Sequence, residues 1–365
     1  MCGINYSSTG MGIIWGPAQD IAQVPECICY DWMQNVCASG GVGAHNVNQL
    51  VRVVAQAGVT LAEITAFIQK VVQPKSNRTL RSFKFEQRIA DNPRAPIKAF
   101  ASEMLSLVPA LALMCDVVLG GFDPLREHVA CFLLLAHTLD ILSHNNDTMD
   151  FLPPLDTLLR QYHTSFCKLY PGCVKPKIHY MLHCCQQLRK IGANVSCFAP
   201  ERAHRWTKTV GGFAFKYMCR TMTARMVAMV LDHATDTDTF KACVLGPAAP
   251  MYWRKHGGLI QSHCRKLGAQ AARAAKTPVS EAHVGDLLAL RCPGGDVALA
   301  WCLACCGCDD QVALVVSQLA PEGGARYRAS PSGAAGVVQA SALLARLIYY
   351  NDGDFVHAYV PITLR

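Results

Sequence analysis

The sequence has no uninterrupted run of eighteen or more apolar residues, so no stretch has the length that a membrane-spanning helix requires. Its first residues, MCGINYSSTG, lack the basic segment and the apolar core of a signal peptide. Charged residues make up only 16% of the chain against 51% hydrophobic residues, a balance that excludes a largely disordered protein. We therefore expect a folded nuclear or cytoplasmic protein that is neither secreted nor membrane-bound.

Two familiar ligand-binding motifs are incomplete. The glycine-rich stretch ASGGVGAHN, residues 38–46, lacks the Gly-Lys-Ser/Thr end that a phosphate-binding loop needs. His179 and His183 have the four-residue spacing of a zinc pair on a helix, but Tyr180 stands where the H-E-x-x-H motif has glutamate. Histidines that form hydrogen bonds or face phosphates are therefore the alternative to a zinc site.

Cysteine, in contrast, is abundant, and most of the 19 cysteines lie inside apolar runs such as ALAWCLACCGC. This placement favours buried thiols over disulfides in a reducing compartment. Four cysteines close together, with Cys292 as an additional ligand, could form a zinc site, but only one of the two knuckles that such a site normally pairs is evident. Buried thiols of a β-hairpin are the favoured interpretation of Cys302, Cys305, Cys306 and Cys308.

Positive charge is concentrated in one block, because residues 160–276 contain 19 Lys and Arg residues but only 4 Asp and Glu residues. Such a block is the expected footprint of a nucleic-acid partner, although solvation of a surface can also produce it. A smaller basic patch, residues 71–88, has Phe83 and Phe85 between its cations. These two rings either stack on bases or form the inward face of a short strand.

Hydrophobic spacing predicts mainly helices before residue 190 and strands near the C-terminus. Two amphipathic helices are expected within residues 46–72, divided at Gly58, then two apolar helices within 99–143 and another before Pro171. ECICYDWM, residues 26–33, predicts a buried strand ending at Asp31. Residues 246–258 lack periodicity, residues 265–280 predict a basic linker or a helix, and alternating runs from about residue 283 predict antiparallel strands.

Three stretches, in this order, resemble segments of DDE-type transposases related to the CACTA (En/Spm) and Kyakuja–Dileera–Zisupton groups. YDWMQ, residues 30–34, is similar to their Y-D-W-M-H segment. KPKIHYMLH and CFAPERAHR, residues 175–183 and 197–205, are similar to their K-P-K-x-H-x-x-x-H and C-F-x-x-E-R-x-H-R segments. FASEMLSLVPAL also resembles the helical region of such proteins. The resemblance covers roughly residues 1–260, and the C-terminal tail more loosely.

The resemblance implies an RNase H-like fold whose Asp, Asp and Glu side chains hold two Mg²⁺ or Mn²⁺ ions on either side of the scissile phosphate of DNA. It makes Asp31 the second acid and Glu201 the third, both catalytic and both metal ligands, with no organic cofactor. Residues 1–45 then become a partial RNase H-like core, 46–190 a helical insertion, 191–276 the Glu201 helix with a basic helical segment, and 277–365 a small barrel-like antiparallel β domain. The expected fold class is α+β, predominantly α-helical.

The chain departs from the transposase pattern in three ways, one of which is Pro200 and Ala203 near Glu201, where the family often has His and Lys. Too little sequence precedes Asp31 for the strands that carry the first acid, and Gln34 replaces a histidine with an amide that cannot carry a proton. We therefore expect an N-terminally truncated protein that is inactive by itself and binds the DNA backbone. The residues expected to contact phosphates are Lys175, Lys177, Arg189, Lys190, Arg202, His204, Arg205 and Lys208.

Two alternatives remain open at this stage. One is an active Mg²⁺-dependent transposase completed by a separate N-terminal part. The other is a non-enzymatic interaction module, in which the C-terminal β unit binds a protein partner or a second copy of the chain and the basic block is only solvated.

Overall fold

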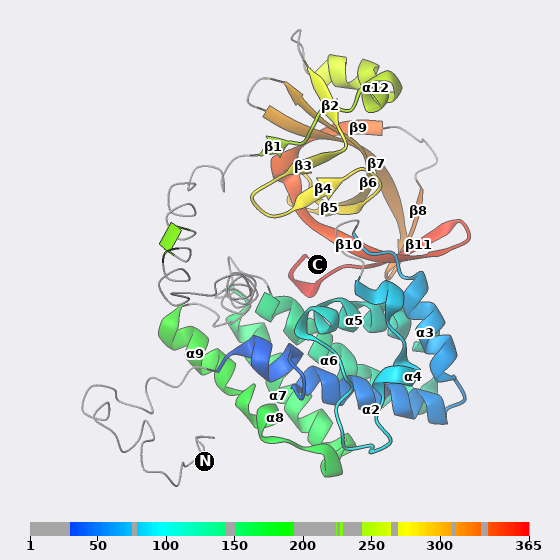
Figure 1. The fold of residues 1–365 in the computed structure, drawn as a ribbon, viewed down its shortest axis with the longest axis vertical. Helices are drawn as coiled ribbons and strands as arrows, with labels where there is room; N and C mark the ends of the chain where they lie inside the picture. Colours follow the sequence, from blue (N-terminus) through cyan, green and yellow to red (C-terminus); the bar gives the residue numbers. More distant parts are fainter. Residues whose placement is uncertain are drawn as a thin grey trace, which may run out of the picture. The chain divides into compact units, whose positions relative to one another are not determined.

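The computed structural model of the 365-residue chain divides into two compact units (Figure 1). One unit comprises residues 1–60, 85–105 and 124–199, and the other comprises residues 61–84, 106–123 and 200–365. The first unit is helical and the second contains the sheets, so the expected α+β class is confirmed. The described residues are 30–74, 79–143, 150–192, 224, 227, 228, 243–263, 269–308, 311–329 and 335–364.

The first unit is built around three long helices, α2 (Val42–Gln56), α6 (Arg126–Ser143) and α7 (Leu152–Leu169). Helix α6 packs against both α2 and α7, and its Phe132 is fully buried together with Tyr162 and Phe166 of α7. Shorter helices α4 (Phe85–Arg88), α8 (Pro176–Tyr180) and α9 (His183–Ile191) complete the unit. The helix expected to end before Pro171 ends at Leu169, as predicted.

The other predicted helices are also present. Helix α3 (Leu61–Lys70) follows α2 after Gly58, whose φ of 102° only glycine adopts readily, and α5 (Ala101–Met114) precedes α6. With the π-helix Cys115–Leu119, α5 forms a 19-residue helix that is apolar enough to cross a membrane, with a mean hydropathy of 1.7. However, 67% of its most apolar window is buried inside the structure, as in the core helix of a folded domain.

The glycine-rich stretch between Cys37 and α2 has a purely steric explanation. Gly40 has a φ of 73°, in the left-handed region, and a Cβ on Gly41 would lie 2.6 Å from the backbone oxygen of Val36. The two glycines therefore allow the chain to turn from the π-helix Met33–Cys37 directly into α2.

In the second unit six antiparallel strands close into a ring in the order β5–β6–β7–β8–β11–β10. Their bounds are β5 (Leu287–Arg291), β6 (Val297–Cys308), β7 (Gln311–Gly323), β8 (Arg326–Ala329), β10 (Leu343–Asp352) and β11 (Phe355–Tyr359). Strand β2 (Gln270–Ala272) pairs with β6, and β9 (Ala335–Gln339) pairs with β7. A separate sheet contains β1 (Val244–Leu245), β3 (Ala274–Lys276) and β4 (Glu281–His283). The expected antiparallel strand set is confirmed.

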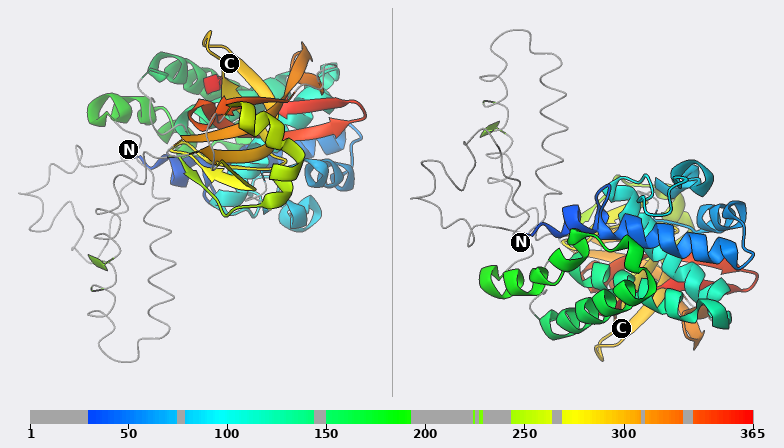
Figure 2. Two further views of the ribbon diagram at one scale, coloured as in Figure 1. Left: turned by 90° about the horizontal axis from the view of Figure 1, so that it is seen from above. Right: turned by 90° about the horizontal axis from the view of Figure 1, so that it is seen from below.

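Two expectations for residues 246–280 are wrong. Residues 250–263 form helix α12 (Pro250–His263), which begins with proline at its first position and lies across the strands of this unit (Figure 2). The Ala-rich segment expected as a linker or helix instead supplies β2 and β3. Its small side chains are buried in sheet pairing, with Ala271 opposite Cys306 and Ala272 opposite Cys305, and this packing overrides the helix propensity of alanine.

Phe83 and Phe85 are 1% and 0% exposed, so they are not available to stack on bases. The inward orientation is confirmed but the strand is wrong, because Phe83 follows the 3₁₀-helix Thr79–Ser82 and Phe85 begins α4. Cys302, Cys305 and Cys306 are thiols rather than disulfides and are buried in the hairpin strand β6, which confirms the hairpin interpretation for these three residues.

Candidate nucleic-acid interface

Asp31 is not a strand residue, so the expectation is wrong for the described residues 30–33, and the rest of the predicted strand, residues 26–29, lies outside the described residues. Tyr30 and Asp31 belong to no regular element, and Trp32 begins a helical turn that continues as the π-helix Met33–Cys37. The Asp31 carboxylate accepts a hydrogen bond from the Gln34 backbone N–H at 3.1 Å, and its backbone oxygen accepts one from the Asn35 N–H at 2.9 Å. An aspartate in this position caps the start of a helix, and this local bonding competes with extended backbone.

The segment around Asp31 contacts the segment around α8 and α9, although the two lie far apart in the sequence. The Gln187 side chain donates a hydrogen bond from Nε2 to the Tyr30 backbone oxygen at 3.1 Å, and its Oε1 accepts one from the Tyr30 N–H. Lys177 donates from Nζ to the backbone oxygen of Gln34 at 2.9 Å. Two of the three stretches that resemble transposase motifs are thus adjacent in space.

Aromatic and imidazole rings line this contact. Tyr30 stacks on His183, with ring centroids 4.8 Å apart and an interplanar angle of 20°, and lies 5.7 Å from Tyr180. His183 meets His179 edge to face at 5.0 Å, and His179 meets His163 of α7 at 6.4 Å. These five residues, here called the ring cluster, form a continuous series of ring contacts.

The two histidines with helical spacing do not share one helix. Met181 and Leu182 form a turn, so His179 lies near the end of α8 and His183 begins α9. Apolar residues of this segment face inward: Ile178, Met181 and Cys185 are each at most 1% exposed. Among the described residues, no group of three or more His, Cys, Asp or Glu side chains is placed to hold a metal ion.

The lysines of this segment alter the titration of a buried histidine. Burial lowers the pKa of His45, and the charges of Lys175 and Lys177 lower it further. His45 is only 5% exposed and its Nδ1 has no hydrogen-bond partner, so a neutral ring is favoured there. Burial also lowers the pKa of Lys177, whose side chain is tied to Gln34 rather than fully solvated.

Arg189 and Lys190 are exposed in the last turn of α9. The helix ends at Ile191 and is capped by Gly192, which has a φ of 75°. Cations in this position also stabilise the helix dipole, so their location has a structural explanation as well as a functional one. Burial, and to a smaller extent Asp156 of α7, raise the pKa of the Cys185 thiol to about 11. The charges of Arg189 and of Arg160 on α7 act in the opposite direction and lower it. Arg160 is paired with Asp156 at 3.0 Å, whereas Arg189 supplies charge to the surface beside it.

The remaining predicted site residues, Glu201, Arg202, His204, Arg205 and Lys208, lie outside the described residues. Asp31 contributes one carboxylate, already accepting a backbone N–H, and Gln34 contributes a neutral side chain; they belong to no described group of three or more His, Cys, Asp or Glu side chains. Two-metal catalysis requires several carboxylate ligands, so this set does not by itself fit a pair of Mg²⁺ or Mn²⁺ ions. Any such site at Asp31 would depend on residues beyond the described ones.

The sequence indicated Asp31, Lys177, His179 and His183 as candidate site residues, but it did not indicate three of the residues that contact them. Tyr180 and Gln187 had no distinguishing local pattern, and His163 lies on α7, in a different helix. Only tertiary packing brings them together.

Comparison with protein-family models, curated protein sequences and solved structures finds no match to this chain.

Proposed function

We propose that this chain is a transposase-derived DNA-binding protein that by itself lacks a complete metal-dependent strand-transfer site. The observation that carries the proposal is the contact of residues 30–34 with residues 177–187, across 143 to 157 residues of sequence. Residues 30–34 and 177–183 of this contact belong to stretches that resemble transposase motifs, and spatial adjacency is what a shared site requires. A nuclear location follows from a DNA partner.

The partial RNase H-like core and its helical insertion rest on the resemblance alone. Among the described residues, every strand lies at or after Val244, apart from an isolated bridge at Val72. The catalytic part of the proposal therefore names only Asp31 and Glu201 as candidate metal ligands. The alternative is an active Mg²⁺-dependent enzyme that is completed by a separate N-terminal part.

The DNA-binding part rests on the cations beside the ring cluster. Lys175, Lys177, Arg189 and Lys190 lie on or next to α8 and α9, and Asp31 is the one acid within residues 30–34. Lys and Arg bind phosphates without reading base sequence, and each neutralised phosphate releases counterions. We expect affinity to be independent of sequence and to fall steeply with salt.

The test is fluorescence anisotropy of a labelled DNA duplex titrated with the full chain between about 50 and 200 mM salt. Arg189→Ala with Lys190→Ala should reduce the slope of log affinity against log salt by about 0.9 for each phosphate that the variant no longer neutralises. The matched control is Arg326→Ala with Arg328→Ala, two exposed arginines of β8. An affinity that does not change with salt would overturn the proposal.

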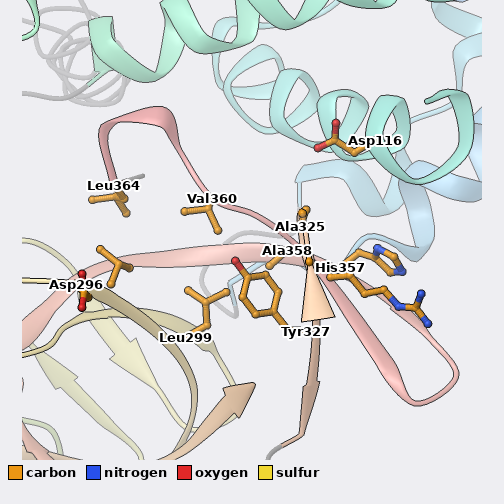
Figure 3. Close-up of a pocket in the computed structure, with 13 residues that line it drawn as sticks. Asp116, Asp296, Leu299, Ala325, Tyr327, His357, Ala358, Val360 and Leu364 are labelled. Carbon is orange, nitrogen blue, oxygen red and sulfur yellow. The ribbon is translucent and has the colours of Figure 1, made fainter. Parts of the chain in front are cut away.

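A second candidate function, binding of a protein partner or a second copy by the β unit, is favoured by a cavity of about 760 Å³ in the second unit (Figure 3). Leu299, Ala358 and Val360 give it apolar lining, and Tyr327 lies among them. A cavity of this size is within the range of binding pockets. Light scattering of the wild type and of Leu364→Glu, a change at the cavity lining, tests self-association: a monomeric wild type counts against it.

A further inference from the structure

We propose that the ring cluster, Tyr30, His163, His179, Tyr180 and His183, binds unpaired bases of single-stranded or frayed DNA. This inference rests on the proposed DNA-binding function and specifies its substrate. Tyrosine and histidine rings are the side chains on which unstacked bases stack, and stacking tolerates any base because each has a π-face. The charge-based proposal alone makes no distinction between an intact duplex and a separated strand.

The rings form a path rather than a single contact. Successive centroid distances are 5.7 Å from Tyr180 to Tyr30, 4.8 Å from Tyr30 to His183, 5.0 Å to His179 and 6.4 Å to His163. Three separate elements contribute to it, namely the chain before the Met33–Cys37 helix, the α8–α9 segment and α7. A series of rings of this length can contact more than one base.

Part of each ring residue is accessible from solvent. His179 is exposed, and the other four residues are half-buried rather than enclosed in the core. This separates them from Phe83 and Phe85, which are aromatic and lie among cations in the sequence but are fully buried. Accessibility is the property that a stacking surface needs and that the two rings of the basic patch at residues 71–88 lack.

The cluster is also held in position. Both backbone groups of Tyr30 bond to the Gln187 side chain, and the Lys177 bond to Gln34 fixes α8 against the same segment. His183 Nδ1 lies 3.1 Å from Oε1 of Gln186, which orients its ring. Rings that are fixed before binding lose less conformational freedom when a base stacks on them.

The charges beside the rings favour a polyanion. On the elements that form the cluster, Asp31 uses a carboxylate oxygen to cap a turn and Asp156 is paired with Arg160. The cations Lys175 and Lys177 stand within four residues of His179, while Arg189 and Lys190 lie on the helix that His183 begins. Phosphates of a strand whose bases stack on the rings would therefore meet positive charge on α8 and α9.

A metal ion is the competing occupant, because three histidines lie close together and His163 Nε2 is 4.0 Å from the Cys167 thiol. However, the described side chains form no group of three metal ligands, and the imidazoles meet ring edge to ring face rather than converging on one point. Base stacking therefore accounts for the geometry better than coordination does.

The experiment measures binding of the full chain to three DNA probes: a single strand, a blunt duplex and the same duplex with unpaired ends. The variants are His179→Ala with His183→Ala, and the ring-retaining pair His179→Phe with His183→Phe. We expect the alanine pair to weaken binding to the single strand and frayed duplex about tenfold and to leave the blunt duplex unchanged within about twofold. The phenylalanine pair should retain the single-strand affinity, because it keeps the stacking surface.

A second readout reports stacking directly. The fluorescence of 2-aminopurine in the unpaired end should be quenched by the wild type and by the phenylalanine pair, but not by the alanine pair, with circular dichroism verifying that all three are folded. Equal loss on all three probes, or no loss, would overturn the inference while leaving the DNA-binding proposal intact. If the wild type binds none of the probes in a salt-dependent way, the DNA-binding proposal itself fails. Dependence of the quenching on zinc, abolished by a chelator, would assign the histidines to a metal instead.

Discussion

The Nζ of Lys177 lies 2.9 Å from the backbone oxygen of Gln34, and this hydrogen bond joins two segments that are 143 residues apart in the sequence. The lysine was predicted only as a phosphate ligand, but its bond and its partial burial give it a structural role as well. Burial lowers its pKa, in agreement with a side chain that lies against the protein.

Lys177→Met should therefore destabilise the first unit as well as weaken DNA binding. We expect a loss of about 1 kcal/mol in the free energy of unfolding, below the usual range for hydrogen bonds to charged groups because this one is partly exposed. Urea unfolding followed by circular dichroism measures it, and Lys175→Met is the matched control. Equal stability of the two variants would show that the bond to Gln34 contributes nothing.

Stability should fall in acid because of His45. Its pKa is lowered in the fold by burial and by Lys175 and Lys177, so below the usual histidine pKa of about 6.5 the unfolded chain takes up a proton that the folded chain resists. The stabilising contribution is complete above this pH and is lost as the pH falls through it. His45→Phe should flatten the dependence, measured by urea unfolding at pH 7.5 and 5.5.

The exposed His179, changed to Phe, provides the control for that experiment. It makes the same histidine-to-phenylalanine change at an exposed position of the same unit, so an effect seen only for His45→Phe belongs to the buried site. If both variants keep the full slope, His45 is not the group responsible.

Two thiols near Asp31 should report opening of the first unit. Burial, with a smaller contribution from Asp31, raises the pKa of Cys37 to about 12, and burial raises that of Cys184 to about 12 as well. Thiolates are the reactive form, so alkylation of both should be slow in the folded protein and fast in urea. Mass spectrometry of labelled peptides measures the rates, with the half-buried Cys292 as an internal comparison. Rapid labelling of Cys37 under native conditions would contradict its burial.

The sequence indicated the helices correctly where apolar residues recur at helical spacing, as in α2, α6 and α7. It failed for β2 and β3, because alanine favours helices in isolation and only pairing with β6 makes Ala271 and Ala272 strand residues. It also missed α12, where Gly257 and Gly258 interrupt the pattern although Pro250 marks its start. Local pattern carries no information about such partners.

The candidate site, like the fold, was only partly predictable from the sequence. Motif residues such as Asp31, Lys177 and His183 were identifiable one by one, since each belongs to a short recognisable stretch. The contacts of Tyr30 with Gln187 and His183 could not be predicted, because they depend on how α9 packs rather than on any nearby residue. The strand prediction was wrong at Asp31 itself, because the Asp31 carboxylate accepts a hydrogen bond from the backbone N–H three residues later.

That capping bond gives a way to separate the structural role of Asp31 from a catalytic one. Asp31→Asn keeps a side-chain oxygen for the Gln34 N–H, whereas Asp31→Ala removes it, so the alanine variant alone should lose about 1 kcal/mol of unfolding free energy. A metal ligand behaves differently: both variants lose the negative charge that a hard divalent ion needs. Thermal unfolding with and without Mn²⁺ distinguishes the two roles. If Mn²⁺ raises the melting temperature of the wild type but of neither variant, Asp31 binds metal in addition to capping. If it raises none, or all three equally, Asp31 acts as a cap and is not a functional metal ligand.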